Sequence, residues 1–166
     1  MQLLIDAGAP VTNDVLAPGA TPASMTEHNL VYHLYYMHNA SANAILDLVL
    51  AQGLSPNQVD EDGRPLYFST YTTRATLEIL ARHGADFTRL DPRADRLQQN
   101  ALMNSVALEK WPEALFFLER GLSPGYAAPD GRTARTLLAE VAPPGKEFYG
   151  DGKAAHAAFV VALGKR

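Results

Sequence analysis

Residues 50–70 read LAQGLSPNQVDEDGRPLYFST. An apolar run ends at Gly53, a stretch of turn-forming residues follows, and Gly63 comes just before a new apolar run. A glycine directly after an apolar helical run is typical of a helix C-terminus, because glycine adopts the left-handed conformation without a steric penalty. The stretch therefore predicts a helix that ends at Gly53, a protruding loop, and a second helix that begins just past Gly63.

The same pattern recurs along the chain. Apolar runs also end at a glycine in LLIDAG, ILARHG, FFLERG and VVALG, whose last residues are Gly8, Gly84, Gly121 and Gly164. The sequence GLSPNQVDEDGR after Gly53 returns as GLSPGYAAPDGR after Gly121, with an interval of ten residues between the two glycines in both copies. The helix-ending glycines are 45, 31, 37 and 43 residues apart, which scatters around a repeat unit of about 33 residues. We therefore interpret the chain as an internal repeat.

These units resemble the ankyrin repeat family. The family pattern is a turn with Asp-Gly-x-Thr-Pro-Leu-His, a short inner helix, an outer helix that ends Leu-Leu-x-x-Gly, and then Ala-Asp-x-Asn. Residues 60–88, DEDGRPLYFSTYTTRATLEILARHGADFT, match this pattern nearly throughout. Residues 84–86 (GAD) and 130–133 (DGRT) match its two turn motifs. The resemblance implies an all-α fold, a solenoid of about four to five helix-pair repeats with protruding fingers, as a single domain over residues 1–166.

The repeat register predicts where the helices lie. An incomplete first repeat is expected at residues 1–8, and further repeats at about 27–53, 63–84, 99–121 and 131–164. The expected helix pairs are 27–39 with 42–52, 65–72 with 74–83, 99–109 with 112–120, and 132–141 with 152–163. Leu80 and Leu118, each about one turn before a helix-ending glycine, are expected in the core, and Gly84 and Gly121 at positive φ.

Three long segments depart from the family pattern, at residues 9–26, 93–99 and 142–152. Each lies where insertions between repeats usually occur, outside the stacked helices. The expected first outer helix, residues 1–7, has no inner partner before it, although terminal repeats normally need a polar outer face. Two interpretations stay open: the chain is a fragment, or the insertion at 9–26 caps it.

Composition and charge narrow the function. With 47% apolar and 19% charged residues, the chain has an ordinary globular composition. A net charge of −4 offers no overall electrostatic reason to bind nucleic acid or an anionic membrane. The absence of cysteine excludes disulfides and thiolate sites, and neither a secretory signal nor a spanning apolar segment is recognisable. We expect a cytoplasmic protein with no nucleic-acid or membrane partner.

Motifs for catalysis or cofactor binding are missing from the sequence. His28, His33 and His38 are five apart, so they do not share the i, i+4 face of a helical zinc pair. No Gly-x-Ser-x-Gly, Gly-x-Gly-x-x-Gly or Walker loop occurs. The DEDG at residues 60–63 lacks the spaced ligands and closing glutamate of a calcium loop. We therefore expect no enzyme, no cofactor and no metal, which leaves binding.

The resemblance also implies where a partner would bind. In the ankyrin family the variable positions lie at the finger tips and on the concave face of the inner helices. In register, the candidate partner-binding residues are Tyr35, Asn39, Glu61, Asp62, Arg64, Tyr67, Tyr71, Thr72 and Arg93. Tyrosine suits an interface because it buries a large area and keeps a polar tip.

For several of these residues a structural role is an equal alternative. The tyrosines of the second repeat either contact a partner or pack between repeats, and Tyr36, in the row of Phe68, is expected to pack. The charged finger residues either contact a partner or are solvated turn groups. Tyr71 is expected to be exposed.

Three functions follow from this reading. The first is a protein-protein interaction module. The alternative is a dedicated inhibitor or immunity-type protein that occludes the active site of a partner enzyme or toxin, with Glu61 and Asp62 facing a basic cleft. An enzyme or ligand-binding domain with residues 142–152 as a lid ranks last.

Overall fold

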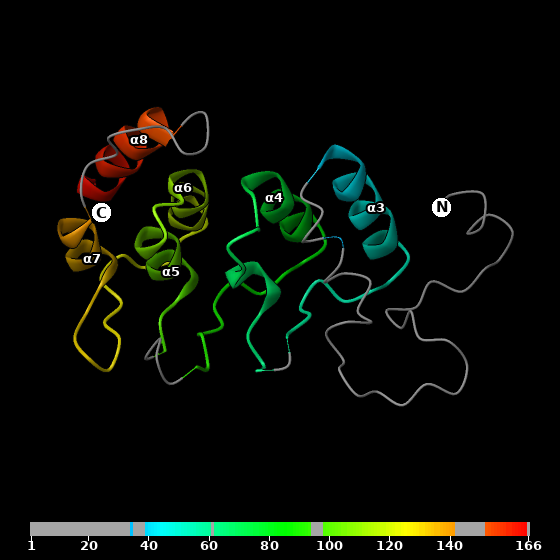
Figure 1. Cartoon of the computed structure of the whole chain (residues 1–166), viewed down its shortest axis with the longest axis horizontal. Helices are drawn as coiled ribbons and strands as arrows, with labels where there is room; N and C mark the ends of the chain where they lie inside the picture. The colour runs from blue at the N-terminus through cyan, green and yellow to red at the C-terminus, as the bar shows by residue number, and fades with distance from the viewer. Residues whose placement is uncertain (1–33, 35–38, 61, 94–97, 142–151, 166) are drawn as a thin grey trace, which may run out of the picture. The chain divides into compact units, whose positions relative to one another are not determined.

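The computed structural model describes residues 34, 39–60, 62–93, 98–141 and 152–165 (Figure 1). This part of the chain is all-α, with six α-helices, one short 3₁₀ helix and no strand. The elements are α3 (Ala40–Ala51), η1 (Leu66–Phe68), α4 (Arg74–Arg82), α5 (Ala101–Ala107), α6 (Trp111–Glu119), α7 (Ala134–Glu140) and α8 (Gly152–Gly164). None of these helices is long and apolar enough to cross a membrane.

The chain divides into two compact units, residues 1–86 and 87–166. In the first unit α3 packs against α4. In the second unit α6 packs against both α5 and α8, and α5 also packs against α7 (Figure 1). The all-α prediction is thus confirmed, whereas the stacking of all repeats into one solenoid stays a prediction.

The helix C-termini explain the recurring glycines. Gly53, Gly84 and Gly121 have φ of +98°, +79° and +91° and directly follow the C-caps of α3, α4 and α6. In each case the glycine N–H donates to the carbonyl three residues back, and the next N–H donates to the carbonyl five residues back. These are the bonds of the Schellman motif, which satisfies carbonyls left open at a helix end. The positive φ predicted for Gly84 and Gly121 is confirmed, whereas Gly164 is still helical and Gly8 lies outside the described residues.

The helix N-termini are closed by short polar side chains. The caps of α3, α4, α5 and α7 are Asn39, Thr73, Asn100 and Thr133, and the side-chain oxygen of each accepts the backbone N–H three residues further on. Such a cap contributes about 0.5–2 kcal/mol relative to alanine. Pro112 lies in the first turn of α6, where a missing N–H does no harm. Local sequence therefore determines both ends of most of these helices.

The core consists mainly of aliphatic and aromatic side chains. Leu80 and Leu118 are fully buried, as predicted. In the second unit the ring of Phe87 makes edge contacts with those of Phe116 and Phe117, at centroid distances of 5.4 and 5.6 Å. Aromatic pairs in this geometry stabilise beyond the area they bury.

The helix predicted for residues 65–72 is wrong in extent, because only the 3₁₀ turn η1 forms there. The sequence STYTT at residues 69–73 explains the difference, since β-branched and hydroxyl side chains favour other conformations over helix. Ser69 is already extended, and the hydroxyl of Thr72 donates to the carbonyl oxygen of Leu66 at 3.3 Å. A side chain thus satisfies a carbonyl that a longer helix would have used.

The remaining predicted pairs agree more closely with the structure. The predicted helices correspond to α3, α4, α5, α6, α7 and α8, with bounds that differ by two residues at most. Their predicted ranges were 42–52, 74–83, 99–109, 112–120, 132–141 and 152–163. The helices predicted at 1–7 and, apart from Leu34 and Asn39, at 27–39 lie outside the described residues, as does Tyr36.

Candidate functional site

The first finger is the loop of residues 54–65 between α3 and η1. The N–H of Asp60 donates to the carbonyl of Arg64, and the N–H of Gly63 donates back to the carbonyl of Asp60, both at 2.9 Å. Gly63 has φ of +74°, which glycine adopts without strain. An isolated antiparallel bridge between Val59 and Pro65 closes the base of the finger.

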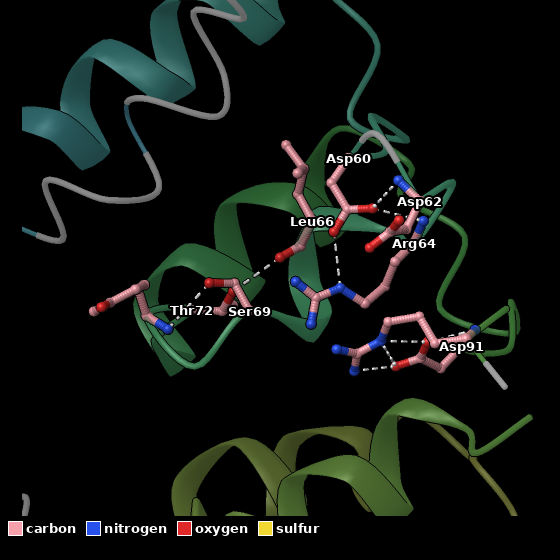
Figure 2. Close-up of polar contacts among 9 residues, drawn as sticks. Asp60, Asp62, Arg64, Leu66, Ser69, Thr72 and Asp91 are labelled. Carbon is pink, nitrogen blue, oxygen red and sulfur yellow. Dashed lines mark hydrogen bonds and ion pairs between the residues drawn. The ribbon is translucent and has the colours of Figure 1, made fainter. Parts of the chain in front are cut away.

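A side-chain clamp holds the tip of this finger. The carboxylate of Asp60 accepts the backbone N–H of Asp62 at 3.2 Å and both the backbone N–H and Nε of Arg64 at 2.9 Å (Figure 2). The Asp60 side chain is nearly buried, whereas Asp62 is exposed. Arg64, expected at a partner interface, therefore also has a structural role within the finger.

The second unit contains a copy of this arrangement in the finger of residues 122–133. The N–H of Ala128 donates to the carbonyl of Arg132 at 2.9 Å, and the N–H of Gly131 donates to the carbonyl of Ala128 at 2.8 Å. The Asp130 carboxylate accepts the backbone N–H of Arg132 at 3.1 Å and also its Nε. These two bonds lower the pKa of Asp130. The repeat seen in sequence between residues 53–64 and 121–132 is thus a repeat of structure as well.

Another finger of the second unit is closed across the insertion at residues 93–99, of which residues 94–97 lie outside the described residues. The N–H of Asp91 donates to the carbonyl of Gln99 at 2.9 Å. Arg93 binds the carboxylate of Asp91 through Nε, at 3.0 and 3.2 Å, and through Nη2 at 2.7 Å. Asp91 is 0% exposed, and a buried carboxylate needs such a partner. Arg93, predicted to contact a partner, therefore neutralises a buried charge of its own finger.

Two of the predicted contact residues lie in the interior of the first unit. The hydroxyl of Tyr67 donates to the carbonyl of Asp86 at 3.0 Å, and its ring stacks on that of Phe68 at 5.1 Å. Tyr67 and Thr72 are both buried. The expectation that they line an exposed helical face is therefore wrong, because the chain there is a tight turn whose polar side chains close its own backbone bonds.

Tyr71 lies in the same turn but faces solvent. Its side chain is 45% exposed, and its backbone N–H donates to the Ser69 hydroxyl at 3.2 Å. Within the described part of the chain, the other large apolar side chains that are exposed are Val160 and Val161. The predicted exposure of Tyr71 is confirmed.

The other expected contact residues say less about where a partner would bind. Asn39 is exposed, but its Oδ1 accepts the N–H of Ala42 at 2.8 Å as the cap of α3. Tyr35 and Glu61 lie outside the described residues. Among the predicted contact residues of the first unit, Tyr71 and Asp62 are therefore exposed side chains other than the cap residue Asn39.

Lys110 has a structural environment that sequence reasoning missed. It is the N-cap of α6, and burial lowers the pKa of its ammonium group, an effect that the charge of Glu113 opposes. The preceding residue, Glu109, has φ of +56° and takes the place that glycine holds at the other helix ends. The N–H groups of Glu109 and Lys110 donate to the carbonyls of Val106 and Ser105, which are again Schellman bonds.

Charge divides unevenly between the two units. Residues 1–86 contain nine carboxylates, three arginines and no lysine, whereas residues 87–166 contain nine carboxylates and eleven lysines or arginines. The first unit is therefore strongly acidic by itself. A sequence count by halves would have revealed this asymmetry, which the overall net charge conceals.

The described residues include no group of three or more metal-ligating side chains. In comparisons with known proteins, the chain matches no family model and no curated protein sequence.

Proposed function

We propose that this protein is a divergent ankyrin-type repeat module that binds another protein through the first unit, with Tyr71 as the main contact and the first finger as a second contact. Two kinds of repeated structure support the repeat assignment. Helices α3, α4 and α6 end in the same hydrogen bonds, and the fingers at residues 54–65 and 122–133 close with the same bonds at equivalent positions. Solenoids built from such units offer extended surfaces for proteins.

The exposed ring of Tyr71 is the observation that carries the proposal. Tyrosine is enriched in the cores of protein interfaces, where a few such residues supply most of the binding energy. Its backbone is held by the Ser69 hydroxyl and lies next to buried Thr72. A ring presented from a fixed turn loses less conformational freedom on binding than one on a mobile loop.

The acidic first unit favours a basic partner. Asp62 is exposed at the tip of the first finger, and complementary charge speeds association and selects among partners. This observation also supports the second candidate function, an inhibitor or immunity-type protein that covers a basic active-site cleft. Binding that slows steeply as salt rises would support a basic partner in either case.

The test begins with affinity capture from native lysate on the full chain. The partner identified there is then titrated calorimetrically with wild type, Tyr71→Ala and Tyr71→Phe. Truncation to alanine should weaken binding by roughly 1–3 kcal/mol, as for other central aromatic contacts, whereas phenylalanine should keep most of the affinity. Melting temperatures of the three proteins should agree, because the ring is exposed.

Gln52→Ala is the matched control, since Gln52 is an exposed residue of the same unit at the end of α3. Normal binding by Tyr71→Ala, together with weakened binding by Gln52→Ala, would contradict the assigned surface. If the partner is an enzyme or toxin, loss of its activity on saturation distinguishes the inhibitor from a simple interaction module.

A further inference from the structure

Helix α8 presents an apolar face to solvent. Val160 and Val161 are 43% and 58% exposed, whereas Phe159 and Leu163 are buried. The buried side faces α6, where the Trp111 ring lies 4.5 Å from that of His156 and 5.9 Å from that of Phe159. A helix that is apolar on all sides is typical of one that is covered on more than one side.

In the helices that end at a glycine, the residues one turn before that glycine can be compared with those before Gly164 of α8. Four residues before the helix-ending glycine, Val49, Leu80 and Phe117 are all buried, but Val160 is not. Three residues before it, Leu50 and Leu118 are buried, whereas Val161 is the most exposed large apolar side chain of the described residues. The position four residues before the glycine is therefore buried in α3, α4 and α6 and exposed in α8. The position three residues before it is buried in α3 and α6, half-buried at Ala81 of α4, and exposed in α8.

The charged side chains that α8 itself carries are all of one sign. Residues 152–165 contain Lys153 and Lys165 and no carboxylate, and both lysines are exposed. We propose that the exposed face of α8 binds an amphipathic α-helix of a partner protein, one whose apolar stripe covers Val160 and Val161 and whose ends carry carboxylates. This helix would continue the series in which α8 packs on α6.

Two other occupants fit this face less well. A second copy of α8 packed antiparallel would bring Lys153 of one chain toward Lys165 of the other, and like charges repel. An anionic membrane would also attract the two lysines, but the exposed apolar area offers only two large side chains, Val160 and Val161, to insert into it. The proposed surface lies in the second unit and does not depend on the role of Tyr71.

The experiment uses the full chain and two synthetic helical probes of about 18 residues, the length of a few helical turns. Both probes carry leucines along one face; one has glutamates at both ends and the other has lysines there. We expect the glutamate probe to bind about tenfold or more tightly than the lysine probe, because each docked end would meet a lysine. The double variant Lys153→Glu with Lys165→Glu should reverse this preference.

Val161→Glu should lower the affinity for the glutamate probe by about tenfold or more, since it places a charge in the apolar contact. The matched control is Ala127→Glu, which adds the same group at an exposed position in the finger of residues 122–133 of the same unit and should leave affinity for the probe unchanged. Circular dichroism verifies that each variant keeps its helices.

Several outcomes would overturn the proposal. One is that neither probe binds, and another is that Val161→Glu and Ala127→Glu have the same effect. Sedimentation of the chain as a dimer that Val161→Glu dissociates would assign the face to a second copy. Binding to phosphatidylserine vesicles that is lost in Val161→Glu would assign it to a membrane.

Discussion

Replacing Gly121 with alanine isolates the conformational role of a helix-ending glycine. Gly121 has φ of +91°, and a Cβ added there would meet no atom within 4 Å. The substitution therefore introduces no clash, so the whole effect comes from the backbone. Holding a residue with a Cβ in the left-handed region costs about 1–2 kcal/mol, and the smaller entropy of the unfolded alanine chain offsets about 0.4–1 kcal/mol of this. We expect a net loss of stability of about 1 kcal/mol, and more for valine, whose branched Cβ is disfavoured there.

The assay is urea unfolding followed by tryptophan fluorescence. Trp111 is the one tryptophan of the chain and is buried in the same unit as Gly121. Gly125→Ala is the matched control, because Gly125 does not have positive φ and an added Cβ would lie 3.7 Å from the Ser123 hydroxyl, an ordinary contact. That variant should be neutral or slightly more stable than wild type.

The comparison of the two variants tests whether positive φ is the reason for glycine at residue 121. Equal shifts in Gly121→Ala and Gly125→Ala would show that positive φ is not the reason for glycine at the end of α6. A stabilised Gly121→Ala would show the same. The stability of Gly121→Asn should lie between those of wild type and Gly121→Ala, because asparagine tolerates the left-handed region better than other residues with a side chain.

Further predictions concern packing, a strained helix end and acid stability. Truncating buried Leu118 to alanine should cost about 2–5 kcal/mol in the same unfolding assay, and a change within about 0.5 kcal/mol would mean that the site is not well packed. Glu109→Gly should stabilise by about 0.5–1 kcal/mol, because φ of +56° is strained for glutamate but not for glycine; a less stable variant would mean that the glutamate side chain outweighs the strain. Hydrogen bonds from His83 and Arg82 lower the pKa of Asp47 below its ordinary 3.8, so the stability these bonds contribute is present above about pH 4 and is lost as pH falls through the lowered pKa. Unfolding at several pH values should show Asp47→Asn to be about 0.2–1 kcal/mol less stable than wild type near neutral pH, with the difference vanishing in acid, and a difference that persists in acid would refute this account.

Helix ends were predictable from sequence because their chemistry is local. A glycine directly after an apolar run predicts a helix end with left-handed backbone, and Gly53, Gly84 and Gly121 all have positive φ. The prediction of a helix at residues 65–72 was wrong for a reason that is also local. The prediction followed the family pattern and gave too little weight to the residue types present there. The run of serine, threonine and tyrosine there favours side-chain bonds to the backbone over helix.

The candidate site was less predictable, because the burial of each side chain determines whether it can contact a partner. Tyr67 and Tyr71 are four residues apart and chemically identical, yet one is buried and the other is 45% exposed. Arg64 and Arg93 were expected to contact a partner, which stays a prediction, and each also binds an aspartate of its own finger. The sequence shows that an aspartate lies within four residues of each arginine. It does not show that Asp91 is fully buried and so requires its arginine.

Comparison of the two copied fingers separates structural residues from those free to vary. Both fingers require a glycine with positive φ followed by an arginine whose N–H is held by an aspartate. In the first finger that aspartate is Asp60, at the base of the turn; in the second it is Asp130, at the tip, and Ala128 takes the base position. Since the clamp functions from either position, only the first finger has a tip carboxylate, Asp62, that the clamp does not use. This difference directs the search for a basic partner to the first finger rather than to its copy.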